Sequence, residues 1–258
     1  TPLYSSAASD VYKRQDVYND IHMGNCAEIC ARDRTYSIND QNDFAKESYR
    51  RAIAAQKSGA FNNEIIDIDI KNKKNTTTIK DDEEPRKANF EKMDTLAPVF
   101  EEGGSITAAN ASKINDGAAC LLLMSEYKAS ELGFKPLVRI INQASAAHDP
   151  KWFTTAPIKA IKKVLMKADM EVNDIDLWEI NEAFAPVVMS VIDDYNLDPG
   201  KININGGAIA LGHPIGASGA RILTTLIHSL NQRDLSIGLA TLCIGGGEAS
   251  ALIVERVN

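Results

Sequence analysis

Two side chains that can exchange protons stand in glycine-rich stretches of this sequence. His213 lies within residues 205–220, NGGAIALGHPIGASGA, and Cys243 ends an apolar run just before three consecutive glycines in LCIGGGEAS. Glycine lets a backbone approach a ligand closely, so we expect both side chains to face a cavity. A thiol and an imidazole at one cavity act as general acid and base, and the backbone N–H of Gly245 is placed to donate to a developing oxyanion.

Each of these residues also has a purely structural interpretation. A lone cysteine at a strand end is most often an inert apolar residue, and a lone histidine is most often held by backbone partners. Asn181 follows the apolar stretch IDLWEI and precedes a predicted helix, so a helix cap explains it without any catalytic role. The catalytic interpretation therefore depends on these blocks occurring together.

Three blocks occur in a fixed order along the chain: NEAFAP at 181–186, then the glycine-rich block around His213, then CIGGG around Cys243. In this order the chain resembles the thiolase family, whose members join or cleave acyl units on coenzyme A. The resemblance implies acetyl-CoA acetyltransferase activity and assigns proton transfer to Cys243. It assigns activation of an acyl-carrying cysteine and donation to the thioester oxygen to His213, and orientation of an oxyanion-hole water to Asn181, with Glu182 anchoring neighbouring backbone.

The same resemblance points to a pocket for a coenzyme A thioester. It assigns contacts with the pantetheine arm to five residues, which are His22, Met23, Ser112, Ala183 and Phe184. A pantetheine arm is partly apolar and carries a few amides, which suits this mixture of side chains. Simple core packing is the alternative for Met23 and Phe184. Phe153, at a position that lines the acyl pocket of relatives, favours short acyl groups.

The resemblance also implies an α/β fold of layered αβαβα type, built from two similar halves. We expect residues 134–258 to form the complete C-terminal half and 113–133 the last strand and helix of the first half. Residues 16–112 are predicted to be a surface-lying loop subdomain that covers coenzyme A and makes oligomer contacts. Residues 1–15 fit none of these patterns and are interpreted as a non-native leader.

The acyl-carrying cysteine of the family belongs to a small-residue motif upstream of anything in this chain. Cys120 lies in the apolar run AACLLL, and Cys26 and Cys30 lie in GNCAEICA without an elbow of small residues, so none of them replaces it. We therefore expect the C-terminal portion of a thiolase, with the first half mostly missing. Such a chain is predicted to be inactive in isolation.

Hydrophobic periodicity predicts the elements that position these residues. Ser37 and Asp40 have the spacing of a capping box and Gly59 that of a stop, which predicts a helix between them. Further patterns predict a half-exposed strand at 65–70, a solvated charged loop at 71–92, a buried strand near 118–125 and a helix that stops at Gly133. After that point an α/β sheet covered on both faces is expected, with strands at 137–144, 175–180, 201–204, 236–243 and 249–256 and helices at 157–168, 182–195 and 216–231.

Composition narrows the partners and the compartment. The chain has 258 residues, a formal net charge of −7 and four cysteines. No run reaches the ~18 apolar residues of a membrane span, and an acidic chain is not expected to bind nucleic acid or an anionic membrane. Unpaired cysteines favour a reducing compartment, cytoplasmic or alternatively mitochondrial. The resemblance implies a homo-oligomer, a dimer or tetramer, with no cofactor beyond the coenzyme A thioester substrate.

Two other functions stay open, and a metal site is not predicted. His22, Cys26 and Cys30 stand four apart and could share a helical face as metal ligands, but three ligands around Gly24 make a poor zinc site, so no metal is predicted. Within the superfamily, a longer-chain 3-ketoacyl-CoA thiolase is the nearest alternative, whereas β-ketoacyl synthases generally have a second histidine where this chain has Asn181. Outside enzymes, the alternative is a non-catalytic binding module for coenzyme A or acyl-CoA.

Overall fold

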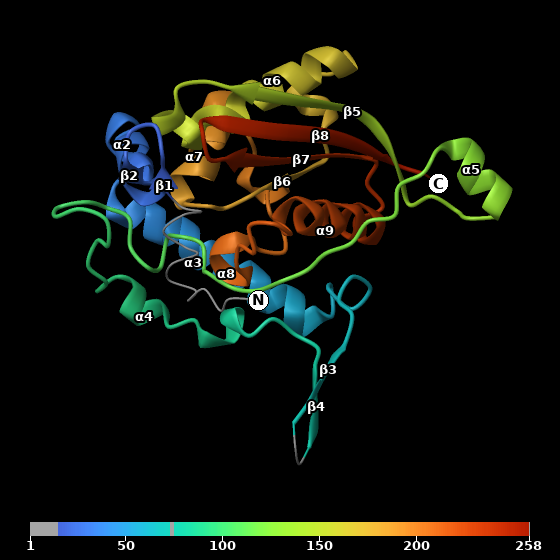
Figure 1. Cartoon of the computed structure of the whole chain (residues 1–258), viewed down its shortest axis with the longest axis horizontal. Helices are drawn as coiled ribbons and strands as arrows, with labels where there is room; N and C mark the ends of the chain where they lie inside the picture. Colours follow the sequence, from blue (N-terminus) through green and yellow to red (C-terminus); the bar gives the residue numbers. More distant parts are fainter. Residues whose placement is uncertain (1–14, 73–74, 258) are drawn as a thin grey trace.

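A mixed four-stranded sheet forms the framework of the chain. The computed structural model describes residues 15–72 and 75–257, and the sheet runs in the order β5-β8-β7-β6 (Figure 1). β6 and β7 pair in parallel, whereas β8 pairs antiparallel with both β5 and β7. The four strands are β5 (Val138–Ala147), β6 (Leu177–Ile180), β7 (Ile237–Ile244) and β8 (Glu248–Arg256).

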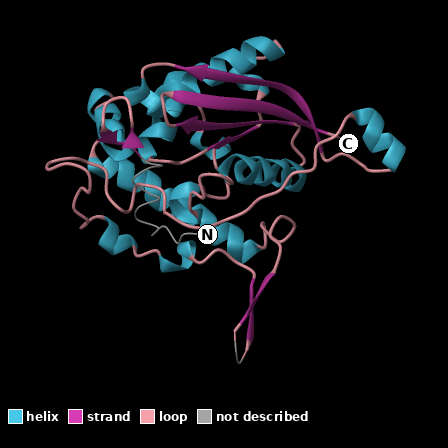
Figure 2. Cartoon of the chain, in the orientation of Figure 1, coloured by secondary structure: helices cyan, strands magenta, loops and turns pink. Residues whose placement is uncertain are grey.

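Helices cover both faces of this sheet, as the sequence predicts. α6 (Ala156–Ala168) and α7 (Ala185–Tyr195) lie on one face and α9 (Ser218–Arg233) lies on the other (Figures 1 and 2). Side chains of a strand alternate between faces, so in β6 Trp178 packs toward α6 and α7 while Leu177 packs toward α9. The core therefore has two apolar layers, one on each face of the sheet, with the short buried strand β6 between them.

Two further helices pack into the body from the N-terminal side. α2 (Met23–Asp33) and α3 (Ile38–Ser58) bury apolar residues in clusters shared with α7 and with the short helix α8 (Ala208–Leu211). The expectation of a surface-lying segment is wrong for these helices, because α3 carries a stripe of small and aromatic residues that α8 covers: Ala45, Tyr49 and Ala52. The predicted start and stop of α3 are confirmed.

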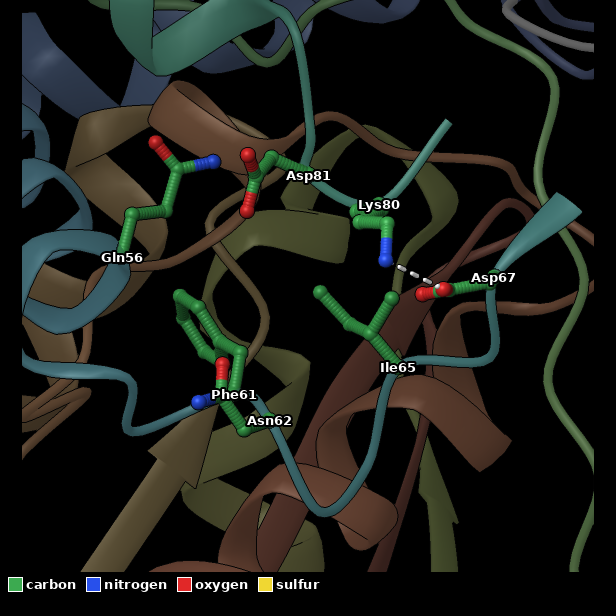
Figure 3. A pocket seen from close by; sticks show the side chains of 7 residues that line it. All are labelled: Gln56, Phe61, Asn62, Ile65, Asp67, Lys80 and Asp81. Carbon is green, nitrogen blue, oxygen red and sulfur yellow. Dashed lines mark ion pairs between the residues drawn. The ribbon is translucent and has the colours of Figure 1, made fainter. Parts of the chain in front are cut away.

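The remaining elements are short. The hairpin formed by β3 (Ile68–Lys71) and β4 (Thr76–Ile79) projects from the body (Figure 1), and both of its strands are exposed. Because β4 lies within the charged loop predicted at 71–92, part of that loop is in fact a strand. At the root of the hairpin, a cavity of about 340 Å³ lies beside the Lys80–Asp67 ion pair (Figure 3). The other short elements are β1 (Gln15–Asp16), β2 (Ile21–His22), α4 (Phe90–Met93), α5 (Glu126–Leu132) and the 3-10 turns η1 (Glu84–Lys87), η2 (Pro150–Thr155), η3 (Val172–Asp174) and η4 (Pro199–Lys201).

Two predicted strands are wrong. Residues 118–125 form no strand, and Leu122 and Leu123 are 77% and 64% exposed, because no described strand pairs with this segment. The strand predicted at 201–204 does not form either. Ile202 makes one bridge, with Trp178, and the Asn203 side chain then hydrogen-bonds to the backbone N–H and carbonyl of Ile180, which ends the strand pairing there. The helix after the first of these segments does stop at Gly133. The predicted domain boundaries stay predictions, and residues 1–14 of the predicted leader lie outside the described residues.

Candidate active site

The loop between α8 and α9 presents His213 at one edge of the sheet. Gly212 has φ 103°, a backbone conformation in which a side chain is strained, and a Cβ there would collide with the side chain of Asn115. The backbone N–H of His213 donates to the carbonyl of Lys113 at 3.0 Å. The glycine before the histidine is therefore required by close packing of the loop.

The His213 ring is held by a hydrogen bond on each nitrogen. Nδ1 lies 2.5 Å from the Ser218 hydroxyl, which itself donates to the carbonyl of Pro214 at 3.1 Å. Nε2 lies 3.4 Å from the amide nitrogen of Asn181, which can only donate. These contacts fit the tautomer that carries its proton on Nδ1, with the Ser218 hydroxyl accepting from Nδ1 and donating to Pro214. In that tautomer Nε2 is suited to take a proton and afterwards to donate a hydrogen bond.

Asn181 connects the two parallel strands at this edge. It follows β6, its side chain is fully buried, and its backbone N–H donates to Thr241 in β7 at 3.0 Å. Among the described residues, the side-chain Oδ1 has no hydrogen-bond partner. The helix-cap interpretation is wrong because α7 begins at Ala185 with Phe184 as its cap, three residues further on. A buried amide with an open acceptor and a donor aimed at an imidazole indicates a binding role.

Glu182 anchors the glycine-rich loop from inside. Its buried carboxylate accepts hydrogen bonds from Ser48 at 2.7 Å, from the Asn203 side chain at 2.9 Å and from the backbone of Ile209 at 3.1 Å. Burial raises the pKa of Glu182. The network joins α3 to α8 and so fixes the segment that leads to His213.

Cys243 lies near the end of β7, on the strand that pairs with β6 at Asn181. Its side chain is 8% exposed and belongs to an apolar cluster that includes Phe153 and Phe184. Burial raises the pKa of this thiol to about 12, so it holds its proton at neutral pH. Because β6 and β7 run parallel, their ends meet at one edge, which brings the thiol to the side of the sheet where Asn181 binds His213.

The three glycines after Cys243 make a turn with one open side. A Cβ built on Gly245 would meet no atom within 4 Å, so this backbone borders open space. Gly247 has φ 78°, and its carbonyl accepts from the backbone of His148 at 2.9 Å. The turn is thus fixed on one side and open on the other, as a backbone donor site requires.

The residues predicted to contact coenzyme A gather around the same apolar cluster. Met23, Ala183 and Phe184 belong to it together with Cys243. The backbone N–H of Ser112 donates to the carbonyl of Ala183 at 3.1 Å. His22 caps α2 through Nδ1, which accepts from Gly24, and its ring stacks on Phe100, which in turn meets Phe184 edge-on. Contact with coenzyme A stays a prediction for all five.

The other cysteines lie in different surroundings. Cys26 and Cys30 are fully buried inside α2, and burial raises the pKa of both thiols, that of Cys26 to about 11. Cys120 is exposed in the segment before α5. Within residues 15–72 and 75–257, no three histidine, cysteine or acidic side chains are grouped to hold a metal ion. In the same ranges no helix is long and apolar enough to cross a bilayer.

Sequence reasoning missed three residues that shape the site. Ser218 stands inside the quoted glycine-rich block, five positions after His213, so its spacing was a usable signal. Lys113 contributes a backbone carbonyl to the His213 loop, and Phe100 stacks on His22. No local pattern marks the last two, because both contacts join segments far apart in the chain.

Comparison with known proteins identifies a family to which this chain is similar. The description "Thiolase, C-terminal domain" matches residues 134–256, and "Thiolase, N-terminal domain" matches residues 2–127. Acetyl-CoA acetyltransferase from Yarrowia lipolytica is 47% identical over 94% of this chain and 61% of its own length. A crystal structure of Bacillus anthracis acetyl-CoA acetyltransferase superposes with a TM-score of 0.92 at 43% identity, covering 95% of this chain and 62% of that one. An Ascaris suum thiolase in complex with coenzyme A gives 0.86 at 39% identity, covering 94% and 62%.

The chain belongs to the thiolase family, and the predicted thiolase-like α/β fold is confirmed. The expectation that the first half is mostly missing is not borne out, because the N-terminal family description matches residues 2–127. The chain spans about three fifths of the length of the curated relatives it matches. Those relatives include bacterial, fungal and mitochondrial acetyl-CoA acetyltransferases.

Proposed function

We propose that this chain carries the proton-transfer machinery of an acetyl-CoA acetyltransferase, which condenses two acetyl-CoA molecules to acetoacetyl-CoA and coenzyme A and catalyses the reverse thiolysis. One observation carries the proposal. The His213 imidazole is bound on Nδ1 by Ser218 and on Nε2 by Asn181, at the edge of the sheet where Cys243 lies near the end of β7. An oriented imidazole and a buried thiol at one edge of the sheet suit proton transfer at a thioester.

In the proposed reaction, Cys243 first releases its thiol proton, which reaches Nε2 of His213 through water, and the resulting thiolate removes a proton from the methyl group of a bound acetyl thioester. The negative charge moves to the thioester oxygen. His213, once protonated on Nε2, donates to that oxygen together with a water held by Asn181, and the backbone N–H of Gly245 serves the second oxyanion. Burial suits Cys243 to this role, since a thiol with a raised pKa gives a more basic thiolate.

The substrate is proposed to enter along the apolar cluster. The pantetheine arm would lie against Met23 and Phe184, with Ser112 and Ala183 at the bridge between their segments and His22 at the end of α2. Phe153 fills the cluster beside Phe184 and favours a short acyl group over a long chain. No further cofactor is needed, since each proton has a side chain or water to receive it.

Complete thiolysis also requires a cysteine that carries the first acyl group. Cys26 and Cys30 are fully buried within a helix and Cys120 lies outside the cluster around Cys243, so none of them is placed to hold the first acyl group. We therefore propose that this chain performs proton exchange but not complete thiolysis. Free thiols at all four cysteines suit a reducing compartment such as the cytoplasm. Assembly as a homo-oligomer is proposed from the family alone.

Proton exchange at acetyl-CoA tests the proposal without requiring the acyl-carrying cysteine. In D₂O, the chain should exchange the acetyl methyl protons faster than buffer does, followed by proton NMR, with a rate that rises about tenfold per pH unit between pH 7 and 10 because the thiolate fraction rises so. Cys243→Ser should lose this acceleration, and Cys120→Ser, the matched control at an exposed thiol, should keep it. Absence of exchange by the unmodified chain, or equal exchange by Cys243→Ser, would refute the proposal.

A further inference from the structure

A largely buried hydrogen bond between Arg221 and Glu179 joins α9, which begins with Ser218, to β6, which leads to Asn181. Arg221 in α9 places Nη1 3.4 Å from Oε2 of Glu179 in β6, and the two side chains are 20% and 2% exposed. Glu179 stands two residues before Asn181, which binds Nε2 of the imidazole. Arg221 stands one helical turn after Ser218, which binds Nδ1, so Arg221 and Ser218 share a helix face. The Arg221–Glu179 pair therefore links the two segments that contribute the hydrogen bonds to His213.

The apolar packing of α9 leaves its position along the sheet to be set by something else. Ile222, Leu226 and Leu230 pack against Leu177 and its neighbours. Hydrophobic contact is non-directional, so it fixes the distance of a helix from a sheet better than its axial register. Polar pairs within a core are the groups best known for specifying register.

Arg221 is also a cation near two carboxyl groups, of which Glu179 is buried and Glu64 partly buried. Burial raises the pKa of Glu179 to about 8 and of Glu64 to about 7, while Arg221 opposes both shifts. The Thr225 hydroxyl, on the next turn of α9, donates to Glu64 at 3.4 Å. The same face of the helix thus makes polar contacts along its length.

We propose that Arg221 is a positioning residue, which through Glu179 sets the register of α9 against β6 and thereby holds Ser218 and Asn181 at hydrogen-bonding distance from the two nitrogens of His213. The inference rests on the proposed roles of His213 and Asn181 in proton transfer. A displacement of about 1 Å in such a site lowers the rate by about 10²-fold.

Nitrogen-15 NMR of the His213 ring tests the proposal directly. The chain has four histidines, so the nitrogen-15 signals of each ring can be assigned. In the unmodified chain, His213 should show one protonated and one bare ring nitrogen. In Arg221→Met, shown to be folded by circular dichroism, these two signals should move toward a common averaged value, as they should in Ser218→Ala, and the rate of methyl-proton exchange should fall about 10²-fold. Unchanged His213 signals in folded Arg221→Met would overturn the proposal.

Three further variants make the outcome decisive. Arg139→Met, which removes an exposed ion pair with Glu255, should leave His213 as it was. Glu179→Leu removes the acceptor for Arg221 and serves if Arg221→Met does not fold; it should move the same His213 signals, and no movement counts against the proposal. The double variant Ser218→Ala with Arg221→Met should lose no more exchange than Ser218→Ala alone, whereas additive losses would contradict action through Ser218. The ring signals need no turnover, so a failure of the proposed function is distinguishable.

Discussion

The buried thiol of Cys243 should resist alkylation to a degree that the structure allows us to work out. Burial raises its pKa from the ordinary 9.0 to about 12, which corresponds to about 4 kcal/mol in favour of the thiol. At pH 8 the thiolate fraction is then about a thousandfold lower than that of an ordinary cysteine. A more basic thiolate is more nucleophilic, which offsets roughly 20-fold of this difference. Alkylation should therefore be about 50-fold slower, before any effect of poor access.

Iodoacetamide labelling followed by peptide mass spectrometry measures this rate for each cysteine separately. The Cys243 rate should keep rising about tenfold per pH unit past pH 10, whereas an ordinary thiol levels off above its pKa near 9. Exposed Cys120 is the internal reference, and Cys120→Ser identifies its peptide signal. Labelling of Cys243 as fast as Cys120 at pH 8, or levelling near pH 9, would show that burial does not control this thiol.

Two predictions concern stability. Ser37→Ala removes the hydroxyl that accepts from the Asp40 backbone and leaves the backbone N–H of residue 37 donating to the Asp40 carboxylate. It should lower the free energy of unfolding by about 1 kcal/mol in urea titration, whereas Ser37→Asn, which still caps, should lose much less. The folded-state pKa values of Glu64, about 7, and Glu179, about 8, lie above the unfolded value of 4.5, so their protonated forms favour folding below pH 4.5 and this contribution is lost as pH rises through 7 to 8. The stability difference between the unmodified chain and Glu179→Gln should therefore fall across this window, and a flat difference would show that Glu179 titrates normally.

Local signals allowed much of the fold to be predicted. The boundaries of α3 follow from Ser37, Asp40 and Gly59, because caps and left-handed stops act within one turn of the helix. The strands β7 and β8 and the helices α6, α7 and α9 follow the periodicity of their apolar residues, although their ends differ from the predicted ones by up to three residues. The short helix α8 was not predicted. These elements share short-range causes that a sequence displays directly.

The errors arise where a distant partner decides the outcome. An apolar run becomes a strand only if another strand supplies hydrogen bonds, and residues 118–125 have no such partner among the described residues. Conversely, Thr76–Ile79 forms a strand from polar residues because it pairs with β3. Asn181 shows the same limit, since its position before a helix suggested a cap, while the true cap lies at Phe184.

By itself, the sequence determined which groups are available for chemistry: the imidazole of His213, the thiol of Cys243, the amide of Asn181 and the glycines that let a loop pass close to its neighbours. It also determined the family, because those blocks stand in one order. Only the tertiary structure decided which hydrogen bond each ring nitrogen of His213 makes and that Arg221 pairs with Glu179. Those contacts join residues from 5 to 42 positions apart, and their distances depend on how helices pack on the sheet, which no local pattern of residues specifies.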